Sequence, residues 1–289
     1  MKNIIKKYPL KSYYLFALIF SGFCWTFSQL IAAAGGYQIY SVDSLNLLFS
    51  KGFEDAIHVS AYIVFSLAVY GPLLASLAVA GVCNGKDGIK EIFFKKNSKQ
   101  FSKKWYIILL LPALINLVAI MIAFAFNNKF EFVSIYPLIW LLPFFCYQII
   151  TSGMEEPGWR GFLLPELIKK YGVDKASWMS GLLWAIWHLP FVIPMYWSLG
   201  IFMEITTIVG FIAAIIAQGY IFAWLYQNTR STIIAILFHA SLNTFSLFII
   251  GATKDPTVAV LPVLLTWVMV FIISKISDKE TFVLKSKKI

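Results

Sequence analysis

Apolar segments of about 20 residues follow one another along almost the whole chain, separated by short polar stretches. A helix needs about 20 apolar residues to cross the hydrocarbon core of a bilayer. Uninterrupted apolar runs of this length favour helices, which satisfy all their backbone hydrogen bonds internally. Of the 289 residues, 60% are hydrophobic and 13% are charged, whereas about a quarter are charged in a soluble domain. The sequence therefore predicts an all-α, polytopic membrane protein.

We expect eight transmembrane helices and one short helix at the membrane interface. The spans cover residues 13–34, 58–82, 105–126, 133–155, 176–193, 205–225, 232–250 and 258–273. After the fourth span, residues 162–170 separate apolar from charged positions, which is typical of an interfacial amphipathic helix. No internal repeat or low-complexity linker divides the chain, so residues 1–289 are expected to form a single membrane domain.

The positive charges are distributed unevenly between the two sides of this topology. The net charge is +10, but the lysines lie between apolar segments, which favours a lipid bilayer and not nucleic acid as the partner. Of 24 lysines and arginines, 21 fall on the side of the N-terminus. Because positive loops stay in the cytoplasm, we expect a multi-pass cell-membrane protein with both termini cytoplasmic. The 22 lysines against two arginines favour an AT-rich genome and hence a bacterial plasma membrane.

Ionisable side chains lie within or at the end of these apolar segments. Each costs about 2.5 to 3.5 kcal/mol at bilayer depth on insertion scales. Glu155, Glu156 and Arg160 stand at the end of the fourth span, His188 lies in the fifth, and His239 lies in the seventh. Such groups are retained in a membrane when they serve a function, so these residues predict a site.

Asn243 follows His239 by four residues, which places both on one helix face. With the glutamates, this set supplies a general base, two imidazoles and an amide donor for an oxyanion. These are the groups needed to hydrolyse an amide bond. His239 lies roughly 10 to 15 Å below the cytoplasmic end of its helix. To meet it, the fourth span must tilt, start after residue 133 or continue past Pro157, which would place Glu155 well inside the hydrocarbon.

Other intramembrane protease chemistries fit the sequence less well. All six aspartates lie outside the spans, which excludes a membrane aspartyl dyad, and no His-Glu-x-x-His motif marks a zinc protease. A serine nucleophile at Ser180 with His239 as base is conceivable. Ser180 lacks the leading glycine of a rhomboid-type site, however, and this alternative leaves the glutamates and His188 unexplained. The remaining histidine, His58, is expected to lie at the interface without a catalytic role.

Three motifs, in order on three spans, resemble the CPBP family of intramembrane proteases. They are Glu-Glu-x-x-x-Arg at 155–160, aromatic-x-x-x-His at 184–188 and His-x-x-x-Asn at 239–243. The family includes the type II CAAX prenyl endopeptidases and bacterial proteins once grouped as abortive-infection or bacteriocin-immunity proteins. The resemblance covers about residues 135–250, the expected catalytic core, and extends to the eight-span architecture. Trp184 stands where the family usually has phenylalanine, which we interpret as a packing variation.

The resemblance implies a role for each matching residue. Glu155 together with His188 would activate a water, and His239 with Asn243 would stabilise the oxyanion. Glu156 and Arg160 would support the site as an ion pair, next to Trp184. The family is interpreted both as metal-dependent and as glutamate-type proteases, and because the sequence has no metal-ligand spacing signature we expect a mechanism without a cofactor. In the alternative, Glu155, His188 and His239 would bind a divalent metal such as zinc.

The sequence thus predicts an intramembrane endopeptidase that cleaves a membrane-embedded or lipid-facing peptide. One alternative is a non-catalytic scaffold or bacteriocin-immunity protein of the same fold. A transporter would show broken spans in two matching halves, which this chain lacks. Asn116 and Gln148 are interpreted as interhelical hydrogen bonds. Immunity, peptide-signal maturation and surface-protein display all remain open as roles.

Overall fold

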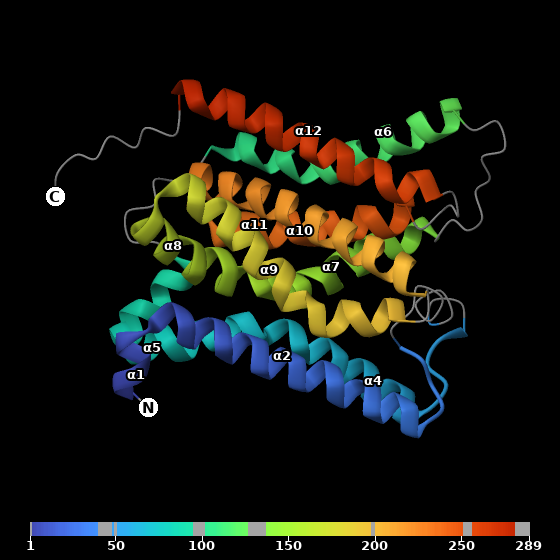
Figure 1. Ribbon diagram of the computed structural model, residues 1–289, viewed down its shortest axis with the longest axis horizontal. Helices are drawn as coiled ribbons and strands as arrows, with labels where there is room; N and C mark the ends of the chain where they lie inside the picture. Colours follow the sequence, from blue (N-terminus) through green and yellow to red (C-terminus); the bar gives the residue numbers. More distant parts are fainter. Residues whose placement is uncertain are drawn as a thin grey trace.

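The chain folds into a bundle of helices (Figure 1). The computed structural model describes residues 2–39, 48, 51–94, 102–126, 137–197, 200–250 and 256–280. Its helices are α1 (Lys2–Lys7), α2 (Pro9–Ala34), α4 (Ala56–Leu67), η1 (Ala68–Tyr70), α5 (Gly71–Phe93), η2 (Lys103–Leu110), α6 (Leu111–Phe126), η3 (Leu138–Trp140), α7 (Leu141–Ile150), η4 (Ser152–Glu155), η5 (Pro157–Leu163), α8 (Leu164–Tyr171), α9 (Val173–Tyr196), α10 (Ile201–Thr229), α11 (Thr232–Phe245), η7 (Ser246–Ile250) and α12 (Pro256–Glu280).

Seven helical segments within these ranges are long and apolar enough to cross a membrane. They are Pro9–Ala34, Ala56–Phe93, Lys103–Phe126, Leu138–Tyr171, Val173–Tyr196, Ile201–Thr229 and Thr232–Ile249. The prediction of an all-α, polytopic membrane protein is therefore confirmed. In α12 the apolar stretch Val260–Ile276 is shorter, so the eighth span and the total of eight stay predictions.

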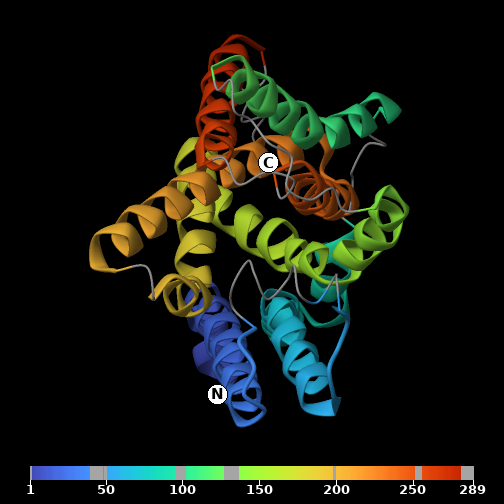
Figure 2. The same ribbon diagram turned by 90° about the vertical axis from the view of Figure 1, so that its right-hand side faces the viewer.

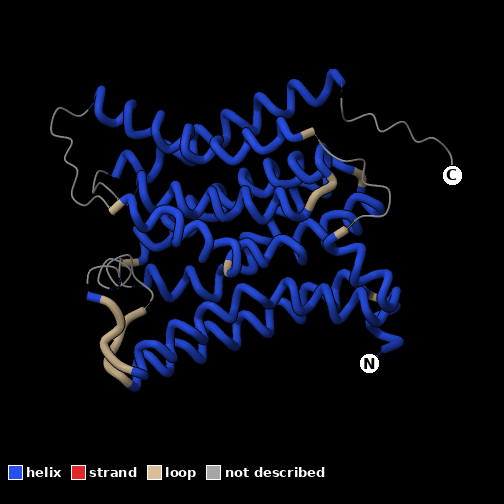
Figure 3. Tube along the Cα trace, turned by 180° about the vertical axis from the view of Figure 1, so that it is seen from behind, coloured by secondary structure: helices blue, strands red, loops and turns tan. Residues whose placement is uncertain are grey.

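Helices from distant parts of the sequence pack against one another in layers. In Figure 1, α2, α4 and α5 lie on one side of the bundle, and α6 and α12 lie on the other. The helices α7, α9, α10 and α11 lie between them. Figure 2 shows α2 and α4 side by side, and the two helices are in contact. The tube in Figure 3 shows helix and loop only, and no β-strand occurs in the described ranges.

The fourth apolar segment runs on through the glutamate motif. Its expected beginning at residue 133 lies outside the described residues. From Leu138 the segment continues to Tyr171, so Glu155 comes 17 residues after its start and 16 before its end. The helical segment continues past Pro157. This continuation is one of the three ways in which the sequence allowed Glu155 to lie at the depth of His239. The segment then ends in α8, at the position expected for the amphipathic helix.

The helix α5 reverses direction at Gly85, which has a φ of 59°. Only glycine adopts this backbone conformation without strain. The residues after Gly85 pack back on those before it, since a Cβ at Gly88 would lie 2.7 Å from the carbonyl oxygen of Ala80. The carbonyl of Ile92 then accepts a 2.9 Å hydrogen bond from the Thr232 hydroxyl. The first part of the expected loop at 84–104 is thus helical and docks on the start of α11.

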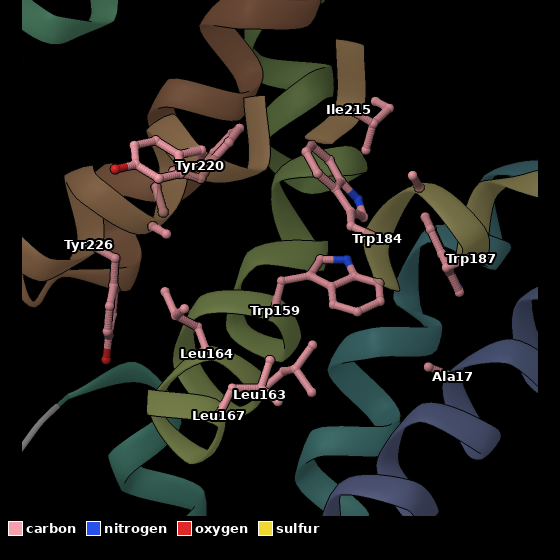
Figure 4. Packing of buried hydrophobic residues seen from close by; sticks show 14 of the residues in the cluster. Ala17, Trp159, Leu163, Leu164, Leu167, Trp184, Trp187, Ile215, Tyr220 and Tyr226 are labelled. Atoms are coloured by element: carbon pink, nitrogen blue, oxygen red, sulfur yellow. The ribbon is translucent and has the colours of Figure 1, made fainter. Parts of the chain in front are cut away.

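Tryptophan side chains fill the centre of the bundle. Trp159, Trp184 and Trp187 are almost fully buried, and Figure 4 shows them close together. The ring centroids of Trp159 and Trp187 lie 5.7 Å apart. Each such ring removes about 150 to 250 Å² from contact with the surroundings. Trp184 and Trp187 also contact residues of the three motifs, because the His188 ring packs against both of them.

Candidate active site

The glutamate motif lies where the fourth segment changes its helix type. The helix α7 ends at Ile150, and Thr151 has the non-helical angles φ −108° and ψ −103°. A 3₁₀ turn, η4, carries Glu155, and the π-helix η5 begins at Pro157. Proline cannot donate the hydrogen bond that would continue a regular helix. The two neighbouring glutamates at this junction have different partners.

Glu155 is 3% exposed and binds the indole of Trp184. The Nε1–H of Trp184 donates to Oε2 of Glu155 over 2.8 Å. The Trp184 ring also lies 5.5 Å from the ring of His188 and 5.4 Å from that of His239, measured between centroids. One indole on α9 thus contacts the glutamate and both histidines, so residues from three separate spans converge.

Glu156 is fully buried and joins two of the other motif residues. Its Oε1 accepts a hydrogen bond from Nη1 of Arg160 at 3.1 Å, which is the ion pair expected from the sequence. The same oxygen lies 2.8 Å from Nδ1 of His239. Because an ionised carboxylate only accepts hydrogen bonds, the proton of a neutral His239 is on Nδ1 and the lone pair is on Nε2. Glu156 therefore fixes the histidine tautomer.

Arg160 is held between two aromatic rings. Its guanidinium carbon lies 4.6 Å from the ring centroid of Trp184 and 4.2 Å from that of Phe222. A cation over an aromatic face is attracted by the ring quadrupole, and the attraction is strongest away from water. The guanidinium thus supports both Glu156 and the ring that holds Glu155.

His188 reaches the site from α9. Its Nδ1 lies 2.8 Å from the backbone carbonyl oxygen of Trp184, one turn earlier. A carbonyl oxygen only accepts, so a neutral His188 carries its proton on Nδ1 and keeps the lone pair of Nε2 available. Both histidines therefore present the same chemistry, a free Nε2 that can take up a proton.

Asn243 lies on α11 and donates from Nδ2 to two residues of the fourth segment. The acceptors are Oε1 of Gln148 at 3.0 Å and Oγ of Ser152 at 2.9 Å. The interhelical bond expected for Gln148 is present, and its partner is a motif residue. Ser152 and Phe222 were not predicted, since a serine beside a glycine and a phenylalanine in an apolar helix give no signal of their own in the sequence.

Two alternatives find no matching geometry. The Ser180 hydroxyl donates to the carbonyl of Ser177 in its own helix, over 3.0 Å. In the described part of the chain, no three His, Cys, Asp or Glu side chains lie close enough together to hold a metal ion. The residues Glu155, His188 and His239 do not form a three-ligand set in this arrangement, and we derive no step through a metal.

The fold and site together define an all-helical membrane protein in which two buried glutamates, a buried arginine and two histidines converge from apolar helices. Residues 137–245 match the family described as type II CAAX prenyl endopeptidase Rce1-like. The chain is 31% identical over 173 residues to CAAX prenyl protease 2 of Methanococcus maripaludis. That alignment covers 55% of this chain and 60% of the relative's length. Both matches support the resemblance to the CPBP family that the three motifs indicate.

Proposed function

We propose that this protein is an intramembrane endopeptidase that hydrolyses a peptide bond of a membrane-associated protein or peptide. The observation that carries the proposal is the shared contact of Glu155, His188 and His239 with the indole of Trp184. A hydrolase needs a base, a proton carrier and an oxyanion stabiliser around one reacting carbonyl. The similarity to the type II CAAX prenyl endopeptidases supports the same class of reaction.

In the proposed reaction, Glu155 and His188 activate the attacking water. Oε2 of Glu155 is bound to Trp184, which leaves Oε1 to take the proton. The water oxygen forms a bond to the carbonyl carbon, and the carbonyl oxygen becomes an oxyanion. Collapse of this tetrahedral intermediate breaks the carbon–nitrogen bond, and the proton held by the site passes to the leaving amine. The products are a carboxylate and an amine.

His239 and Asn243 stabilise the oxyanion in this proposal, as the family resemblance implies. Because Glu156 holds Nδ1 of His239, its Nε2 faces away from that carboxylate. A His239 protonated during the reaction would be stabilised by the negative charge of Glu156, in the way that a buried carboxylate supports an imidazolium. Glu156 and Arg160 then act by keeping His239 in place.

The proposed substrate is embedded in the bilayer or lies on its surface. The relative from Methanococcus maripaludis is a CAAX prenyl protease by name, so a peptide with a prenylated cysteine near its end is the first substrate to test. We place the protein in a bacterial plasma membrane with both termini in the cytoplasm.

The first test compares membranes that contain the wild-type protein with membranes that contain Glu155→Gln at matched expression. Mass spectrometry identifies new peptide termini, and a quenched fluorescent peptide with a farnesylated cysteine serves as a defined probe. Glutamine keeps an oxygen that accepts from Trp184 but removes the base, so we expect cleavage to fall about 10²- to 10⁴-fold with unchanged folding. His58→Gln, outside the motifs, is the control.

A Glu155→Gln protein that still cleaves at the wild-type rate would contradict the mechanism. If wild-type and variant membranes show the same termini while the host phenotype persists, the non-catalytic scaffold or immunity protein is the better description. Repeating the wild-type assay after treatment with a chelator tests the metal-dependent alternative, since loss of cleavage that zinc restores would support it.

A further inference from the structure

A second hydrogen-bond network lies beside the glutamate and histidine residues. It joins Gln148 at the end of α7, Ser152 at the start of η4 and Asn243 on α11. Asn243 Nδ2 lies 3.0 Å from Gln148 Oε1 and 2.9 Å from Ser152 Oγ. The Ser152 hydroxyl in turn donates to Gln148 Oε1. Gln148 and Ser152 are 9% and 8% exposed, so water competes little for these groups.

The donors and acceptors in this network are complementary. A primary amide has two N–H groups, and Asn243 gives one to each of its acceptors. The oxygen of Gln148 has two lone pairs, which take the hydrogen from Asn243 and that from Ser152. Turning the Asn243 amide over would set its oxygen against the oxygen of Gln148. Gln148 and Ser152 therefore hold the Asn243 carboxamide in the substrate-free site, and one of its two N–H groups leaves its acceptor when it donates to the oxyanion.

The network also links the two halves of the proposed catalytic machinery. Ser152 stands three residues before Glu155 on η4, and Asn243 stands four residues after His239 on α11. At Gly153 the two elements touch, since a Cβ there would lie 2.9 Å from Cγ2 of Ile236 on α11. The bonds of Ser152 thus act at the point where the segment of Glu155 rests on the helix of His239.

We propose that Gln148 and Ser152 are positioning residues, which orient the Asn243 carboxamide and hold the Glu155 segment in register with His239. This assignment rests on the proposed function. Neither residue needs to touch the substrate to act in this way. Their effect is on the turnover step, because a small misplacement of groups that act in the transition state costs up to about 10²-fold in rate.

The test measures kcat and KM of purified protein in detergent micelles with the farnesylated, quenched fluorescent peptide. We expect Ser152→Ala to lower kcat at least about tenfold with little change in KM, because the loss occurs after substrate binding. Ser152→Thr, which keeps the hydroxyl, should recover most of the rate. Gln148→Met should resemble Ser152→Ala, and the double variant should be no slower than the worse single variant, since all three residues act as one unit.

The matched control is Ser21→Ala. Ser21 is also buried and donates a hydrogen bond of 2.7 Å between helices, to the carbonyl of Ala68. It is distant in sequence from Gln148, Ser152 and Asn243, and its partner Ala68 is not part of their network. Thermal unfolding of each variant separates stability from turnover. We expect Ser21→Ala and Ser152→Ala to lose similar stability, while only Ser152→Ala loses turnover per folded molecule.

The outcomes separate this assignment from the proposed function. If Glu155-dependent cleavage is found and Ser152→Ala keeps the wild-type kcat, the network is structural and the assignment alone is wrong. A rate that falls equally in Ser152→Ala and Ser152→Thr also contradicts it, because the hydroxyl is then not the group that matters. If the wild-type protein shows no Glu155-dependent cleavage of the probe or of membrane proteins, the proposed function fails and this assignment fails with it.

Discussion

Trp184 shows how a single residue changes the interpretation of a motif. From the sequence, it is a large aromatic where the family usually has phenylalanine, and a packing variation is the simplest explanation. The structure gives it a second property, because its Nε1–H donates to Glu155 over 2.8 Å. Phenylalanine has no such donor. In this chain, the residue one turn before His188 both fills space and orients the proposed base.

Trp184→Phe should therefore destabilise the protein beyond its loss of volume. A hydrogen bond to a charged group contributes about 1.5 to 3 kcal/mol, and removing it leaves the buried Glu155 oxygen without this donor. Trp187→Phe is the control, since Trp187 is equally buried and its indole nitrogen has no partner among the described residues. Thermal unfolding in detergent should show the lower midpoint for Trp184→Phe. Equal midpoints would mean that the bond to Glu155 contributes nothing measurable.

The sequence predicted which residue types meet in the site better than it predicted their partners. Glu155, His188 and His239 were found because ionisable groups are conspicuous in apolar helices, and the Glu156–Arg160 pair was expected from the family resemblance. The bond from Glu156 to His239 could not be predicted. It joins the fourth segment to α11, and residue spacing along one helix does not show which side chain of another helix it meets.

At the scale of elements, the π-helix η5 is positioned by glycines that face α5. A Cβ at Gly158 would lie 2.4 Å from the carbonyl oxygen of Pro72, and one at Gly161 would lie 2.4 Å from that of Ile92. Both contacts are with backbone atoms, which cannot rotate away. Because η5 carries Arg160 and directly follows Glu156, this close approach also sets the position of the buried ion pair.

Gly158→Ala should push η5 away from α5. Overpacking of this kind costs about 1 to 3 kcal/mol, and more where backbone must move. We expect a lower thermal midpoint, a poorer yield of monodisperse protein and loss of cleavage. Gly210→Ala is the control, because no atom lies within 4 Å of the added methyl group and alanine favours a helix by about 1 kcal/mol. A Gly158→Ala protein as stable as Gly210→Ala would show that the two helices separate without cost.

At the scale of the whole molecule, the sequence predicted the fold class because hydropathy is an average over many residues. The sequence predicted a loop where α5 turns back at Gly85. A lysine-rich stretch has the same average hydropathy whether it is helical or not, so its helical structure could not be predicted. Exposed lysines gather on α1, η2 and α8, including Lys2, Lys103 and Lys169. Figure 1 shows α1, α8 and the C-terminal end of α12 at the same end of the bundle.

The number of spans determines on which side of the membrane the C-terminus lies. With eight spans both termini are cytoplasmic, whereas without a crossing by α12 they lie on opposite sides. We expect a C-terminal green fluorescent protein to fluoresce and a C-terminal alkaline phosphatase to be inactive, because the latter works only outside the cytoplasm.

In a variant whose three cysteines are replaced by serine, an impermeant maleimide should label Lys51→Cys on intact cells but Lys169→Cys only after lysis. An active C-terminal phosphatase with this labelling pattern would mean that α12 does not cross. Reversed labelling would mean that the charge rule is broken and that the site receives its substrates from outside.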